Sequence, residues 1–319
     1  MMFFSVVVTL SSSSWLVCWM MMEVSSFFFI PIIYGLWSLS SAVSSMKYFF
    51  VQSIGSSVFL FSILWDSVPF GGWEWVSEEK EMGVITCLSM MFKLGVFPFM
   101  GWMVQISENL SWSKFFLLSS IQEVIPLLMI SKFGSSEGII FFFVCLGMFV
   151  LVMFCFSSYS IHWMMMVSSL FNVGWMVVAA LLSKESLIFF FFVYFSMLYV
   201  FFWVLDEIVS IGSMTTLSSF SVFKGGKTVF LFFVFMMMGI PPLGNFLGKV
   251  EVLTSMISED MIWMSVYFVF MSSVFMFLYL KISLSISMSM KGGEAKLKVP
   301  YLKAIMMGFL FLFFLIWMF

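Results

Sequence analysis

Two glutamates and two lysines lie deep within long apolar stretches of this 319-residue chain: Glu23, Lys93, Glu123 and Lys249. Removal from water disfavours the charged form of both side chains, so a buried lysine and a buried carboxylate can approach neutrality and exchange protons. Formation of an ion pair between them favours both charges again. A lysine–carboxylate pair that opens and closes would therefore hold and release a proton, and proton handling is the chemistry that these residues indicate.

Lys93 lies near the middle of the apolar run Gly83–Gln105, roughly ten residues from either edge. At about 1.5 Å per helical residue, its ammonium group is about 15 Å deep in a membrane helix. A lysine there costs at least ~2.5–3.5 kcal/mol on insertion scales, so it needs a partner or a water-filled path. Pro98 removes a backbone donor and predicts a break in the same helix. A charge beside a helix break is typical of proteins that move ions.

Lys249 follows a second interrupted segment, within residues 228–257. Pro241 and Pro242 have no backbone N–H group to donate, and the stretch is too long for one straight span. A discontinuous helix fits this pattern, as in transporters with ion sites near the membrane midplane, and a simple kink is the alternative. Glu251 is a candidate partner of Lys249.

Some intramembrane charges could instead lie near an interface and extend their head groups to water. Glu23, whose span has loosely defined boundaries, is open to this alternative. Both flanks of Lys93 are long, which argues against it there.

The composition predicts an all-α, polytopic transmembrane helix bundle of about ten or eleven spans, in one integral membrane domain covering residues 1–319. With 63% apolar and 9% charged residues and a mean hydropathy of +1.15, the chain is excluded from the soluble globular proteins. The apolar runs are too long and too unalternating for a transmembrane barrel. The predicted spans cover residues 1–13 (short), 15–34, 46–65, 82–105, 112–131, 138–157, 161–182, 187–205, 228–257 (broken), 261–280 and 302–318.

Lysines predict the orientation of the bundle. In an eleven-span arrangement nine lysines fall on one side and three on the other, and the richer side is expected to be the inner one. This places the amino terminus and the loop 281–303 inside and the acidic loop 66–81 outside. The first side carries Lys47, Lys114, Lys224, Lys227, Lys281, Lys291, Lys296, Lys298 and Lys303, and the second carries Lys80, Lys132 and Lys184.

Several functions find no support in the residue pattern. The four cysteines lie in apolar runs without metal-type spacing, and His162 is the only histidine, so we expect neither a metal site nor a disulfide framework. No basic cluster with interleaved aromatic residues indicates nucleic-acid binding. The start of the chain has no positive region or cleavage site of a targeting peptide. All basic residues are lysine, which with few glutamines and asparagines suggests T- and G-rich codons and an organelle-encoded gene.

Six motifs, in order, give the chain a resemblance to a known family. They are W-x-x-x-E (Trp19–Glu23), KYFFVQS (Lys47–Ser53), FKLGVFPFMGWM (Phe92–Met103), SSLFNVGWM (Ser168–Met176), GIPPLGNFLGK (Gly239–Lys249) and FLYLK (Phe277–Lys281). With these the chain resembles the chain 2 family of the mitochondrial NADH–ubiquinone oxidoreductase (respiratory complex I), the antiporter-like proton-pumping membrane subunits.

The resemblance implies roles for individual residues. Glu23 would pair with Lys93, and Lys249 would be the terminal lysine of a lateral proton path. The chain would carry no cofactor, because NADH, FMN, iron–sulfur clusters and ubiquinone belong to other subunits of the complex. Its partners would be other membrane-arm subunits and the lipid bilayer, in a hetero-oligomer of the mitochondrial inner membrane.

Two positions depart from the family pattern. The family usually has Gln-Lys before the proline at Pro126, whereas this chain has Gln122-Glu123, so Lys93 could face two acids. The basic pair that normally precedes SSLFNVGWM is replaced by His162-Trp163. His162 is interpreted either as an interfacial residue or as a relay element, and Glu251 and His162 are the candidate neighbours of the relay.

Three functions are weighed for the chain. The first is redox-driven proton translocation as one subunit of the respiratory complex. The second is a stand-alone cation/proton antiporter, which would share the charges and helix breaks. The third is a structural subunit that no longer conducts, for which Glu123 in place of lysine is the main support.

Overall fold

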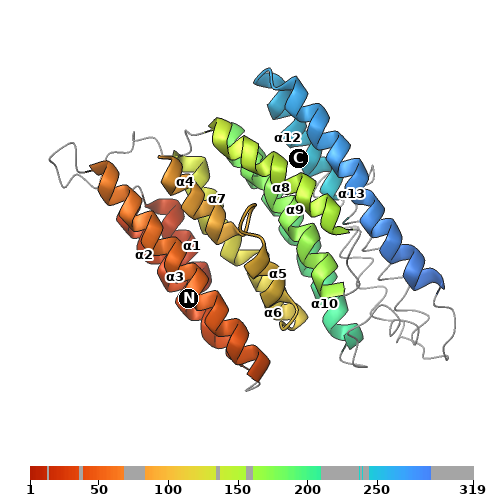
Figure 1. The fold of residues 1–319 in the computed structure, drawn as a ribbon, viewed down its shortest axis with the longest axis horizontal. Coiled ribbons are helices and arrows are strands. Elements are labelled where there is room, and N and C mark those ends of the chain that lie inside the picture. The colour runs from red at the N-terminus through yellow and green to blue at the C-terminus, as the bar shows by residue number, and fades with distance from the viewer. Residues whose placement is uncertain are drawn as a thin grey trace. The chain divides into compact units, whose positions relative to one another are not determined.

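The computed structural model describes residues 1–12, 14–35, 39–67, 83–133, 137–155, 161–209, 237, 239 and 244–288. Within these residues the elements are helices joined by turns, so the predicted all-α class is confirmed (Figure 1). The helices are α1 (Met2–Ser11), α2 (Trp15–Tyr34), α3 (Leu39–Ser67), α4 (Val84–Leu94), α5 (Gly101–Ser107), α6 (Trp112–Leu118), α7 (Ile121–Phe133), α8 (Glu137–Cys155), α9 (Ile161–Leu182), α10 (Lys184–Val209), α12 (Gly244–Ser258) and α13 (Ile262–Met288).

Five helical stretches in the described part are long and apolar enough to cross a membrane: Trp15–Tyr34, Leu39–Trp65, Trp112–Lys132, His162–Leu182 and Lys184–Phe202. The predicted spans 15–34 and 161–182 coincide with α2 and α9. The short first segment forms α1. The span 302–318, residues 228–236, 238 and 240–243 of the broken span 228–257, and most of the two loops used for orientation lie outside the described residues.

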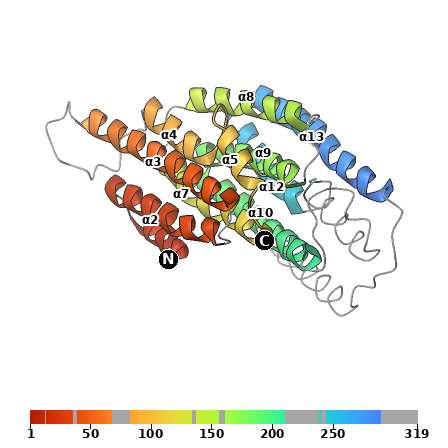
Figure 2. The ribbon, with the colours of Figure 1, turned by 60° about the horizontal axis from the view of Figure 1, so that its bottom comes forward.

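The chain divides into two compact units. The first comprises Met1–Leu151 and Met166–Lys184, and the second comprises Val152–Met165 and Glu185–Phe319. In the first unit α2 packs against α1, α3 and α7, and α4 packs against α3 and α7. Both ribbon views show α2 and α3 side by side (Figures 1 and 2). These contacts bring the helices that carry Glu23, Lys93 and Glu123 into one group.

Two lysines satisfy the carbonyl groups that are left free at helix carboxyl ends. Lys132 Nζ on α7 donates to the carbonyls of Thr9 and Ser12, each at 2.8 Å, at the end of α1. Lys114 Nζ on α6 donates to the Ile33 carbonyl at 3.1 Å, near the end of α2. Because α1 and α2 pack along each other, these are opposite ends of a hairpin. Lys132 and Lys114 thus lie at opposite ends of this hairpin, as the predicted orientation requires. Which of the two ends faces the inner side of the membrane stays a prediction.

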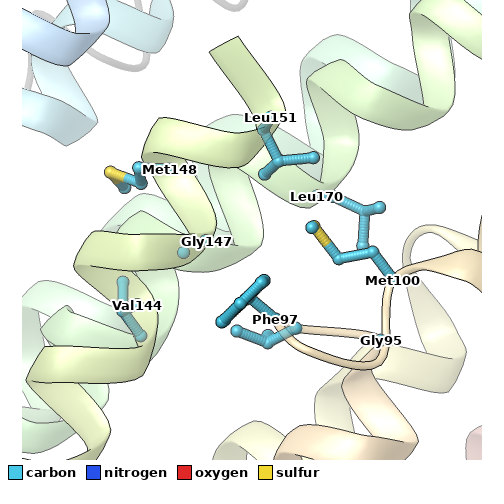
Figure 3. A pocket seen from close by; sticks show the side chains of 10 residues that line it. Gly95, Phe97, Met100, Val144, Gly147, Met148, Leu151 and Leu170 are labelled. Atoms are coloured by element: carbon cyan, nitrogen blue, oxygen red, sulfur yellow. The ribbon is translucent and has the colours of Figure 1, made fainter. Parts of the chain in front are cut away.

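The loop between α4 and α5 rests on α8 through a glycine. A Cβ atom added at Gly147 would lie 2.8 Å from Phe97 Cβ, so only glycine permits this approach. Figure 3 shows Phe97 between the loop that carries Gly95 and the helix that carries Gly147. A small apolar cavity beside it has room for about one water molecule and is also lined by Leu170 of α9.

In the second unit, α12 lies close to α10 through Gly244 and Gly248. A Cβ atom at Gly244 would collide with Met197 Cε, and one at Gly248 would collide with the Phe190 ring. These glycines of the second interrupted segment therefore permit the close approach of α12 to α10.

We expect Gly147→Ala to destabilise the first unit, because the new methyl group overlaps Phe97 and overpacking costs about 1–3 kcal/mol. The variant should lose its monodisperse form in detergent at a temperature several degrees lower. Gly138→Ala, on the same helix with nothing within 4 Å of the added atom, is the control. Equal thermal stability of the two variants would contradict this account of the loop.

Candidate functional site

The helix that carries Lys93 ends one residue later, at Leu94, in a complete capping motif. Gly95 has a φ of 63°, and its N–H donates to the Phe92 carbonyl at 3.2 Å. The Val96 N–H donates to the Met91 carbonyl at 3.0 Å, which completes the six-to-one and five-to-two bonds of a Schellman motif. Glycine tolerates this left-handed conformation without a Cβ clash.

The predicted break around Pro98 is therefore present between α4 and α5 (Figure 1). The Phe99 N–H bonds the Val96 carbonyl at 2.9 Å within the loop, and Trp102 Nε1 of α5 donates to the Phe92 carbonyl at 3.2 Å. These bonds satisfy backbone groups that the interruption would leave exposed to hydrocarbon. The break is thus a stable, hydrogen-bonded element beside Lys93.

The Lys93 side chain is buried, with 4% of its surface exposed. Within the described part of the chain its Nζ has no hydrogen-bond partner. Its stem runs along Gly55 of α3, where an added Cβ atom would be 2.8 Å from Lys93 Cγ. The ammonium belongs to the last turn of α4, where the negative end of the helix dipole favours a cation. The dipole at this helix end thus provides part of the electrostatic stabilisation that water would give to the ammonium group.

Glu23 lies on α2 on the side that meets α3. Trp19, one turn earlier, donates from Nε1 to the Ser56 carbonyl of α3 at 3.2 Å, next to Gly55. The charge of Glu23 acts on Lys93, so the two groups are electrostatic neighbours. Glu23 Oε1 is buried and makes no hydrogen bond to any described residue. The geometry supports a Glu23–Lys93 pair, whose formation stays a prediction.

Glu123 lies at the amino end of a helix, a position that the sequence did not predict. The span expected over 112–131 is divided by a turn at Ser119–Ser120, so Glu123 falls in the first turn of α7. The Ser119 hydroxyl donates to the Phe115 carbonyl at 3.0 Å and thereby satisfies part of the end of α6. Glu123 is 1% exposed, and neither carboxyl oxygen has a hydrogen-bond partner among described residues. An acid at a helix amino end mirrors the lysine at the carboxyl end of α4.

Lys249 belongs to the second unit and is half-buried in α12. Its Nζ would lie 3.5 Å from a Cβ atom at Gly239, whose φ is 73°. Asn245, one turn earlier, donates from Nδ2 to the Met237 carbonyl at 3.1 Å. The start of α12 is thus tied back to the preceding segment. Pro241 and Pro242, the predicted second break, lie outside the described residues.

Two further candidates are Glu251 and His162. Glu251 is exposed on α12, two residues after Lys249, and its role as the partner of Lys249 stays a prediction. His162 is half-buried in the first turn of α9, a position that leaves the interfacial and relay interpretations open. No group of three metal-ligating side chains occurs in the described ranges.

Sequence reasoning did not single out Tyr48 and Gln122, which join two helices beside the charges. The Tyr48 hydroxyl donates to Gln122 Oε1 at 3.0 Å. The scarcity of glutamine in the chain could have drawn attention to Gln122. Gln122 and Gln105 both accept side-chain hydrogen bonds from α3, the latter from Lys47 at 2.9 Å.

A helix bundle with an interrupted helix and buried opposite charges defines an antiporter-like membrane protein. Residues 12–276 match the family described as NADH:quinone oxidoreductase/Mrp antiporter, TM, and the chain belongs to this family. Its fold resembles a chain of respiratory complex I from Thermus thermophilus, with a TM-score of 0.75 and 16% identity over 88% of this chain and 68% of that one. It also resembles a chain of the Mrp complex from Dietzia sp. DQ12-45-1b, with a TM-score of 0.72 and 15% identity over 92% and 59%.

Two relatives illustrate the similarity in sequence. The NADH-ubiquinone oxidoreductase chain 2 of Locusta migratoria is 27% identical over 79% of this chain and 73% of the relative. That of Anopheles gambiae is 31% identical over 62% of this chain and 58% of the relative. The family resemblance predicted from the motifs is confirmed.

We expect Gly55→Ala to destabilise the protein through its overlap with the Lys93 stem, by about 1–3 kcal/mol. Lys93→Ala removes the overlapping atoms, so the same glycine substitution should cost less in that background, which a double-mutant cycle of thermal stability measures. Gly101→Ala, with nothing within 4 Å of its added atom, is the control. Strict additivity of the two substitutions would show that Gly55 does not set the position of Lys93.

Proposed function

We propose that this chain is a proton-translocating membrane-arm subunit of a respiratory NADH–ubiquinone oxidoreductase. One observation carries the proposal: a buried Lys93 without a hydrogen-bond partner ends a broken helix beside the charge of Glu23. Membership of the oxidoreductase/antiporter family and the names of the relatives support it. The chain is then part of an enzyme, with NADH, FMN, iron–sulfur clusters and ubiquinone bound by other subunits.

The proposed mechanism uses Glu23, Lys93, Glu123 and Lys249 as a proton relay. A protonated Lys93 is attracted to an ionised Glu23, and protonation of the acid weakens this attraction, which frees the ammonium to give up its proton. Glu123 offers a second acid on α7, the helix that packs against α4. Lys249 would take the proton onward in the second unit. Electron transfer in other subunits would drive the opening and closing of the Glu23–Lys93 pair.

The proposed setting is the mitochondrial inner membrane, where residues 1–319 form one integral membrane domain. The amino terminus and the loop 281–303 would face the matrix, as the lysine distribution predicts. Neighbouring membrane-arm subunits and lipid would cover the exposed apolar side chains, such as Phe27 and Trp263.

A stand-alone cation/proton antiporter is the second candidate, and the likeness of the fold to a chain of the Mrp complex favours it. The two functions differ in the state of the protein. An antiporter would exchange cations for protons as an isolated chain in liposomes. Migration only within a large respiratory assembly on a native gel would reject this candidate.

We expect Lys93→Met to lower proton pumping at least several-fold in the assembled complex, because the variant keeps the apolar stem but has no ammonium group. Pumping is measured as acidification of the interior of inside-out membrane vesicles during NADH oxidation. The amount of assembled complex is measured on a native gel. Lys184→Met, which removes an exposed lysine at the start of α10, is the matched control. Normal pumping by the Lys93 variant would count against the proposed function.

The role of Glu123 is tested separately from its packing. Glu123→Gln keeps the shape of the side chain but cannot ionise, so we expect assembled complex in normal amount with pumping reduced several-fold. Glu185→Gln, at an exposed acid in the first turn of α10, is its control. Full pumping by the Glu123 variant would instead favour a structural, non-conducting role for this part of the chain.

A further inference from the structure

Tyr48 is a fully buried residue of α3 that contacts three other helices of the first unit. Its exposed fraction is 0%. Its ring packs edge-on against Phe29 of α2, with ring centroids 5.1 Å apart, and lies 6.4 Å from the Trp102 ring of α5. Its hydroxyl donates to Gln122 Oε1 of α7 at 3.0 Å. The Tyr48 side chain therefore connects α3 with α2, α5 and α7, and two of these, α2 and α7, carry Glu23 and Glu123.

The other half of the Gln122 amide continues this connection. Nε2 donates to the Ser25 carbonyl of α2 at 3.3 Å and lies 3.3 Å from Met2 Sδ of α1. The amide oxygen receives a hydroxyl and the amide nitrogen meets a carbonyl, so its partners fix the orientation of the amide. Tyr48 and Gln122 thus form a polar bridge from α3 through α7 to α2.

This Tyr48–Gln122 bridge reaches the surroundings of the three candidate charges of the first unit, Glu23, Lys93 and Glu123. The charge of Glu23 acts on Tyr48 as well as on Lys93. Gln122 directly precedes Glu123 in α7. Trp102, in ring contact with Tyr48, donates to the Phe92 carbonyl next to Lys93.

A tyrosine hydroxyl is not needed to fill this space. Phenylalanine would keep the ring contacts with Phe29 and Trp102, and it would not require a buried hydrogen bond. A buried hydroxyl costs free energy unless it is bonded, and in a water-excluded site its bond is strong and directional. The feature that the hydroxyl adds is a fixed link between helices.

We propose that Tyr48 is a positioning residue of the relay. Its hydroxyl bond to Gln122 holds α3 against α7 and, through the Gln122 amide, α2, at the spacing that lets Glu23 and Glu123 act on Lys93. This inference rests on the proposed function. It assigns a role to Tyr48 and Gln122, which are not among the four charges. This role depends on the hydrogen bond between the two side chains rather than on their packing.

The test is Tyr48→Phe in the intact, assembled complex. We expect a normal amount of complex on a native gel and unchanged NADH oxidation with an artificial electron acceptor, with at least a twofold fall in protons pumped per electron passed to ubiquinone. Tyr199→Phe, which removes the hydroxyl of a side chain that is 56% exposed, is the control and should change none of these quantities.

A second variant separates positioning from folding. Gln122→Met removes the acceptor but keeps an unbranched side chain. The double variant with Tyr48→Phe should pump no worse than the poorer single variant, because Gln122→Met already breaks the bond that Tyr48→Phe removes. Three outcomes would each overturn the proposal. Tyr48→Phe could pump normally, its pumping could fall only in proportion to lost complex, or the effects of the two substitutions could multiply in the double variant. If Lys93→Met also pumps normally, the proposed function itself fails. If Lys93→Met abolishes pumping while Tyr48→Phe does not, only this inference fails.

Discussion

The burial of the Lys93 side chain is the constraint on which the rest of the first unit depends. An ammonium group at this depth is costly, and the chain offsets the cost with local features rather than with a hydrogen bond in the described residues. The carboxyl end of α4 supplies a favourable dipole, a glycine gives the stem room, and an acid on α2 supplies opposite charge. Each feature favours the cation without fixing it in one bond, which suits the change of protonation that we propose for it.

The interruptions follow from the same constraint. A helix end in hydrocarbon exposes carbonyl and N–H groups, so it persists only where other groups satisfy them. At the first break these groups are the Gly95 and Val96 amides and the Trp102 indole. At the turn between α6 and α7 they are the hydroxyls of Ser119 and Ser120, the latter on the Phe116 carbonyl. The first break places a lysine at a carboxyl end and the α6–α7 turn places an acid at an amino end, and both ends suit the charge that they hold.

The sequence predicted the parts of the site that have a local signature. Lys93, Glu123 and the break near Pro98 are visible because a charge or a proline contrasts with an apolar run. The turn before Glu123 has no such mark, since serine is common in these helices and the turn depends on where the hydroxyls bond. The Tyr48–Gln122 bond joins residues 74 positions apart, and the fit of Gly55 to Lys93 depends on how two helices pack. Contacts of this kind require the tertiary structure.

The lysine at the end of α7 has a consequence for how freely the first helix can change. Lys132 holds α1 through main-chain oxygens of residues 9, 10 and 12, so it recognises a helix end and not particular side chains. Substitutions along α1 leave those acceptors in place as long as the segment stays helical and apolar. The anchoring of this helix end thus places little demand on the side chains of α1, whereas loss of one lysine more than a hundred positions away would leave these carbonyls without their donor.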